Sequence, residues 1–165
     1  MKWLMAIIIA AIVLAETTGA VTADPYDDAI AAYRRGDYAT ALQILRPLAE
    51  RGSFRAQYTL AFAYTHGHGV PQNFVEAARW YRRSADQGWA SAQINLANLY
   101  YEGKGEPVDY VSAYFWFALS ASGDLNAETK QGAIEGRDSA AKRLSEAQLA
   151  EAKQWVRLWK PRKER

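Results

Sequence analysis

The segment from Ser53 to Asp124 contains two copies of one residue pattern, separated by a constant offset of 36 residues, as from Ala56 to Ala92. A fixed period of this length is typical of solenoid proteins. Because one unit of this size cannot bury its apolar face alone, neighbouring copies must stack on one another. The sequence therefore predicts an extended, curved surface, and we expect function to lie on that surface. The residues that coincide at this offset are Ala56 and Ala92, Leu60 and Leu96, Ala61 and Ala97, Tyr64 and Tyr100, Gly67 and Gly103, Gly69 and Gly105, Pro71 and Pro107, Ala77 and Ala113, Trp80 and Trp116, and Ala85 and Ala121.

Each copy predicts two helices joined by a glycine-rich turn. Apolar residues recur at helical spacing from Ala92 to Tyr100, so one face of this segment can be buried. The polar residues between them, Gln93, Asn95 and Asn98, are expected to stay accessible to solvent.

The sequence GKGEP ends this first helix. Its two glycines tolerate the positive φ values that a helix end requires, and Pro107 forces the preceding residue out of the α region. Asn73 and Asp109 stand at corresponding positions before the second helices, where a short side-chain acceptor can cap free backbone amides. The turn chemistry therefore agrees with the apolar pattern.

The repeated pattern resembles the Sel-1-like repeat, a relative of the tetratricopeptide repeat with a longer glycine-rich loop. The chain departs from that family at Ala61 and Ala97, where glycine is usual, and at Glu106, where valine is usual. The resemblance implies an α-helical scaffold that binds other proteins or peptides, and it implies no reaction. The residues that carry it in the first copy are Ala56, Leu60, Ala61, Tyr64, Gly67, Gly69, Pro71, Asn73, Ala77, Trp80, Tyr81 and Ala85.

The predicted fold is all-α, an α-solenoid of about three to four stacked antiparallel helix pairs. Residues 24–52 read as a degenerate tetratricopeptide-like first repeat, followed by Sel-1-like repeats at 53–88 and 89–124. Residues 125–160 read as a C-terminal helix pair that caps the solenoid, with Ser145 capping its second helix. The basic tail, 161–165, is expected to be mobile, with weak contact to anionic surfaces as an alternative.

The first 23 residues combine a basic residue, Lys2, with a short apolar run and small residues before Ala23. This arrangement predicts a secretory signal peptide cleaved after Ala23. A retained membrane anchor is the alternative, although a span needs ~20 apolar residues, and no span is expected after cleavage. If the signal is bacterial, the protein is periplasmic or secreted.

Composition excludes several classes of function. The chain has 165 residues, 50% of them hydrophobic, and a formal net charge of only +2, which does not favour a nucleic-acid partner. It has no cysteine, so neither disulfides nor thiolate metal sites are available. His66 and His68 lack a third ligand nearby, so we interpret them as loop residues and predict no metal or cofactor. No catalytic motif is present, and we predict no enzymatic activity.

The first helix of each pair is expected to line the concave side. Its inward-facing candidates for partner binding are Tyr58, Phe62, His66, Ile94, Asn98 and Glu102. An aromatic, amide and acidic mixture suits an extended peptide or loop. We therefore predict an exported scaffold or adaptor in the cell envelope that binds an unidentified protein or peptide. Two alternatives are an envelope hydrolase of the lactam-cleaving or cell-wall type and a self-associating structural spacer.

Overall fold

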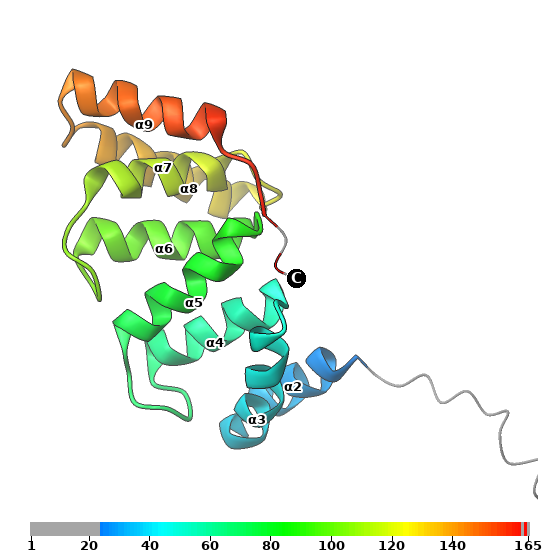
Figure 1. Cartoon of the computed structure of the whole chain (residues 1–165). Coiled ribbons are helices and arrows are strands. Elements are labelled where there is room, and N and C mark those ends of the chain that lie inside the picture. The colour runs from blue at the N-terminus through cyan, green and yellow to red at the C-terminus, as the bar shows by residue number, and fades with distance from the viewer. Residues whose placement is uncertain (1–23, 163, 165) are drawn as a thin grey trace, which may run out of the picture.

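The computed structural model describes residues 24–162 and residue 164, and this part of the chain forms eight helices and no strand. The helices stack in one continuous array from α2 to α9 (Figure 1). The predicted all-α solenoid is confirmed. The predicted signal peptide, 1–23, lies outside the described residues. The helices are α2 (Pro25–Arg34), α3 (Tyr38–Glu50), α4 (Phe54–His66), α5 (Phe74–Asp86), α6 (Ala90–Glu102), α7 (Tyr110–Ala121), α8 (Ala127–Ala141) and α9 (Glu146–Leu158).

The helices α2 with α3, α4 with α5, and α6 with α7 pack as pairs, and each pair packs on the next through α3 with α4 and α5 with α6. The glycine-rich loops after α4 and α6 lie at one edge of the stack, and the short turns after α3 and α5 lie at the opposite edge (Figure 1). In the described part of the chain, no helix is long and apolar enough to cross a membrane.

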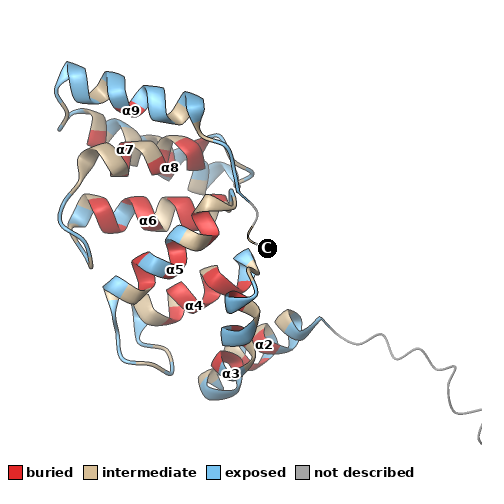
Figure 2. Ribbon diagram, viewed as in Figure 1, coloured by how far each residue is buried: buried red, intermediate tan, exposed pale blue. Residues whose placement is uncertain are grey.

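The repeated residues form the core. Leu60 and Leu96 are fully buried, and the large rings of Trp80 and Trp116 are 7% and 4% exposed. Buried residues follow the interior of the stack through α4, α5, α6 and α7 (Figure 2). Because corresponding positions carry the same residue types, each copy presents a matching apolar surface to its neighbour.

The two glycine-rich loops begin and end in the same way. Gly67 and Gly103 close α4 and α6 in the left-handed conformation, with φ of 73° and 69°. The side chains of Asn73 and Asp109 accept hydrogen bonds from the first backbone amides of α5 and α7, at 3.0–3.1 Å. Both predicted caps are confirmed.

A buried serine links the two helices of each repeat. The Ser84 hydroxyl donates to the carbonyl oxygen of Phe54, and the Ser120 hydroxyl donates to that of Ala90, both at 2.9 Å. Both serines are fully buried. Since Phe54 and Ala90 are the first residues of α4 and α6, these bonds fix the position at which the second helix crosses the start of the first.

Gln93 corrects one prediction, because it is 2% exposed rather than accessible. Its side-chain amide donates to the carbonyl oxygen of Ala85, at 3.2 Å, near the end of the preceding helix. Gln57 makes the same bond to Ala49 at 3.0 Å. Both carbonyls also accept the amide of a turn glycine, Gly52 or Gly88, so the glutamine adds a second hydrogen bond at each junction between repeats and is itself satisfied there.

The C-terminal helices depart from simple pairing, since both α8 and α9 pack mainly against α7. Helix α8 runs through two glycines, and a Cβ at Gly136 would lie 2.6 Å from atoms of the Phe117 ring. Gly136 therefore allows α8 to approach α7 closely. Helix α9 begins at Ser145 with a capping box, and Trp159 at its end meets Trp116 edge to face at 6.5 Å.

The described residues of the segment that follows α9, up to Arg162 and at Glu164, contact the stack. This segment turns back along the edge of the stack that carries the short turns (Figure 1). The backbone amide of Arg162 donates to the carbonyl oxygen of Asp86, at 2.8 Å, and Glu164 pairs with Arg83.

Candidate binding surface

The six candidate residues lie on α4 and α6, three on each helix. The exposed members are His66, Asn98 and Glu102, and the half-buried members are Tyr58, Phe62 and Ile94. Within the described residues, no hydrogen bond, ion pair or aromatic pair joins an α4 candidate to an α6 candidate. The structure therefore forms two neighbouring patches rather than one closed site.

Tyr58 contributes to packing as well as to the surface. Its ring lies 5.8 Å from that of Tyr81 on α5 and 6.5 Å from that of Trp89 before α6. Burial raises the pKa of the Tyr58 hydroxyl further above neutral pH. Tyr58 is therefore a neutral hydrogen-bonding group at the rim of the core.

Phe62 and His66 form the accessible part of the α4 patch. Their rings stack with centroids 4.0 Å apart, and His66 Nδ1 lies 2.9 Å from the carbonyl oxygen of Phe62. His68, in the following loop, brings its ring within 6.1 Å of Phe62 and 5.5 Å of His66. The result is a ledge of stacked rings.

Two tyrosines of the first helix pair extend this ledge. The Tyr33 hydroxyl lies 2.7 Å from His68 Nδ1, and the Tyr38 ring stacks on His68 at 4.6 Å with an interplanar angle of 8°. Burial is the main reason that the pKa of Tyr33 rises to about 12. We call Tyr33, Tyr38, Phe62, His66 and His68 the aromatic–histidine cluster.

Sequence reasoning missed Tyr33 and Tyr38. At the offset of 36 residues they correspond to Gly69 and Phe74, so the repeat pattern gives no signal for them. The contact depends on Gly69, where a Cβ would lie 2.6 Å from the Cβ of Tyr38. The absent side chain lets the loop settle on the start of α3, and this brings His68 to the tyrosines.

The α6 patch is more polar. Ile94 packs partly against the core, and Asn98 exposes its amide one turn further along. Glu102 is exposed at the end of the helix, and its carboxylate lies 2.7 Å from the ammonium group of Lys104. This patch offers an amide for hydrogen bonding and a solvated ion pair.

The arrangement suits binding through stacking and hydrogen bonds. Among residues 24–162 and 164, no three histidine, aspartate or glutamate side chains come together as a metal site. No enclosed pocket is found in this part of the molecule either.

Comparison with known proteins agrees with this architecture. Residues 54–89 and 90–125 each match the model of the Sel1 repeat. No curated protein matches the chain. Together with the fold, the matches give an α-solenoid with two consecutive segments that are similar to the Sel1 repeat.

Two solved structures are similar to this chain. One is c5321, a protective antigen present in uropathogenic Escherichia coli strains and described as displaying an SLR fold, with 30% identity and a TM-score of 0.74. The other is a Sel1 repeat protein from Oxalobacter formigenes, with 26% identity and a TM-score of 0.60. They align with 82% and 79% of this chain, which spans only 29% and 60% of their own lengths.

Proposed function

We propose that this chain is an exported scaffold that binds a protein or peptide partner in the cell envelope, on the surface formed by the first helices of its repeats. The proposed export rests on the signal-like segment before Asp24. The proposed binding rests on the Sel1 repeats and on the surface that α4 and α6 present.

One observation carries the proposal. The two repeats share many buried residues, as at Leu60 and Leu96, yet their surface candidates all differ at the same offset: Tyr58 corresponds to Ile94, Phe62 to Asn98, and His66 to Glu102. Some buried positions also differ, but none of the three candidate positions is shared. Differences of this kind are expected where a solenoid supplies a distinct contact from each repeat.

The partner would be recognised by two kinds of contact. The Phe62–His66 stack offers an aromatic face for an apolar or aromatic side chain. The Asn98 amide can donate to and accept from an extended backbone. We therefore expect a peptide or loop that crosses from α4 to α6.

The test is affinity capture from envelope extract, with the chain from Asp24 onward as bait. A variant with alanine at His66, Asn98 and Glu102 removes only exposed side chains, so its fold should be intact by circular dichroism. A matched control replaces the exposed residues Gln43 and Lys153 on α3 and α9 with alanine. We expect the parent and the control to retain a partner that the triple variant loses.

Two results would count against the proposal. Equal retention by all three baits would place the partner elsewhere on the molecule. If the parent captures nothing that a blank resin does not, the scaffold proposal loses its support. Hydrolysis of a chromogenic lactam by the parent would instead favour the envelope hydrolase.

A further inference from the structure

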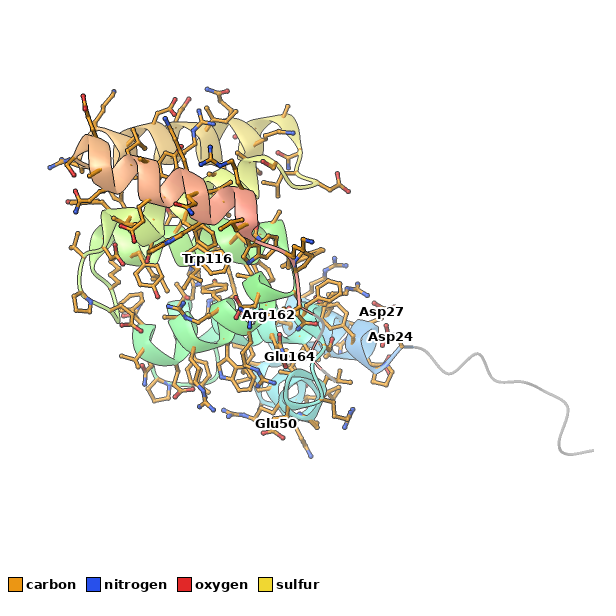
Figure 3. All side chains as sticks on the ribbon, turned by 45° about the horizontal axis from the view of Figure 1, so that its top comes forward. Asp24, Asp27, Glu50, Trp116, Arg162 and Glu164 are labelled. Atoms are coloured by element: carbon orange, nitrogen blue, oxygen red, sulfur yellow. The ribbon has the colours of Figure 1, made fainter. Side chains whose placement is uncertain are left out.

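The segment after α9 runs back along the stack. It passes first the turn after α5 and then the turn after α3. Pro161 lies beside Gly88, in the turn after α5, and its Cβ would be 3.3 Å from a Cβ at that position. Glu164 lies beside Gly52, in the turn after α3, where the corresponding distance is 2.9 Å. The labelled residues Arg162 and Glu164 follow this edge towards Glu50 (Figure 3). A short peptide segment is thus already seated on the turn edge.

The carboxylate of Glu164 is held by side chains of α4 and α5. Its Oε1 accepts from Arg83 Nε at 3.0 Å, and its Oε2 accepts from Arg83 Nη2 and from Gln57 Nε2, the latter at 2.8 Å. Two parallel bonds from one guanidinium are the geometry that recognises a carboxylate most specifically.

The groups that hold the carboxylate are themselves held in place. Gln57 is fully buried, and its Oε1 accepts from Gln87 Nε2 at 2.9 Å while its Nε2 also donates to Ala49. Arg83 lies over the Trp80 ring, with its guanidinium carbon 4.7 Å from the centroid. We call Gln57, Arg83 and Gln87 the carboxylate cradle. The donors of Gln57 and Arg83 point to one place, and Gln87 supports Gln57 from behind.

Packing of the repeat does not require this cradle. At the offset of 36 residues, Gln93 repeats Gln57, but Leu119 and Gly123 stand where Arg83 and Gln87 would be. A Cβ at Gly123 would lie 2.6 Å from the Cβ of Ala90, so the second repeat has no room for a glutamine there. The cradle therefore belongs to the first Sel1 repeat alone, although both repeats share their core.

We propose that the carboxylate cradle is a binding site for the acidic side chain of an extended peptide, and that Glu164 occupies it as a built-in competitor. The chemistry of the ligand is read from the present occupant: a backbone amide that bonds to Asp86, and a carboxylate two residues later. This site is independent of the surface proposed above.

Competition follows from the tether. A segment joined to α9 has an effective concentration of roughly millimolar at the cradle. An incoming peptide must overcome this concentration to displace Glu164. The hydrogen bonds from Arg83 hold the pKa of Glu164 below its usual range, which favours the charged carboxylate that the cradle binds. Both side chains remain more than a quarter exposed, 29% for Arg83 and 27% for Glu164, which leaves the pair accessible for exchange.

The experiment measures binding of a fluorescent peptide with the sequence of residues 159–164, and of its glutamine analogue at the last position. The protein is the chain from Asp24 onward, which carries all eight described helices. We expect Glu164→Ala to bind the acidic peptide at least ~10-fold more tightly than the parent, because the tethered carboxylate no longer competes. The glutamine peptide should bind weakly to both proteins.

Two further variants complete the test. Lys160→Ala, an exposed change in the same segment, should leave affinity at the parent level. Arg83→Leu added to Glu164→Ala should abolish the gain while its thermal unfolding stays cooperative. Equal affinity of the parent and Glu164→Ala, equal affinity for the two peptides, or no binding to Glu164→Ala would each overturn the proposal.

Discussion

Helix α8 contains two glycines that we expect to respond to alanine in opposite directions. A Cβ at Gly132 meets nothing within 4 Å, whereas one at Gly136 lies 2.6–2.9 Å from three atoms of the Phe117 ring. Alanine in a helix is favoured over glycine by roughly 1 kcal/mol, so Gly132→Ala should raise the free energy of unfolding by about that amount. At Gly136 the same gain is opposed by overpacking against a ring that is 3% exposed, a cost of up to ~3 kcal/mol, so the expected net loss is about 2 kcal/mol.

The assay is equilibrium urea unfolding followed by circular dichroism at the helix band, with both variants compared to the parent. Because the substitution is the same in one helix, the two variants share the propensity gain, and their difference of about 3 kcal/mol measures the contact with Phe117. A stabilised Gly136→Ala variant would show that α8 does not depend on this close approach. A destabilised Gly132→Ala variant would show that residue 132 does not occupy an open position within a helix.

Three further predictions address the loops, the buried serines and the segment after α9. Gly105→Ala should lower the free energy of unfolding by about 3 kcal/mol, since φ is +78° and a Cβ would lie 2.8 Å from the Val75 nitrogen. Gly36 has a similar φ of +80° but open space around it, so Gly36→Ala should cost only ~1 kcal/mol in the same urea assay. Ser120→Ala should cost ~1–2 kcal/mol, because the Ala90 carbonyl loses its buried donor, and urea unfolding of the variant measures this. The pKa of Glu164 is lowered on folding, so docking of its segment stabilises the protein at pH values above the ordinary carboxyl pKa. This stabilisation is lost as the pH falls through the lowered pKa, and it amounts to under ~1 kcal/mol because both side chains are partly exposed. Loss of the Arg83 Nε–H resonance in acid, followed by NMR, would report the release of Glu164.

The repeat offset predicted the architecture because packing is set by residue size at fixed places. Alanines and leucines that coincide at 36 residues are buried in both copies, and Asn73 and Asp109 cap the helices as expected. The approach of α8 to α7 was not predicted. From the sequence alone, Gly136 only lowers the helix propensity of α8. Its contribution, room for the Phe117 ring, can be recognised only when the structure places that ring opposite.

The buried glutamines could have been found from the sequence. Gln57 and Gln93 coincide at the repeat offset, as core residues do, and a repeated polar residue among core positions indicates a buried hydrogen bond. Helical spacing alone placed Gln93 on the solvent side, which was wrong. The sequence gives no such sign of the pairing between Glu164 and Arg83, because the two residues are 81 positions apart and meet only where the segment after α9 turns back along the stack.

The same offset separates architecture from recognition in this molecule. Where the repeats share an apolar core residue, as at Leu60 and Leu96, the side chain is buried, and replacing it would disturb the stack. Among the positions where the repeats differ, two sets bear on recognition. The candidates on α4 and α6 differ at exposed or half-buried places, where packing constrains the side chain less than it does in the core. The carboxylate cradle differs at Arg83, whose counterpart Leu119 is 8% exposed, so the two repeats have lost or gained a charge at a place that packing does constrain. Glu164 supplies an anion to Arg83 in this structure, and a partner that takes its place at the cradle would supply one instead.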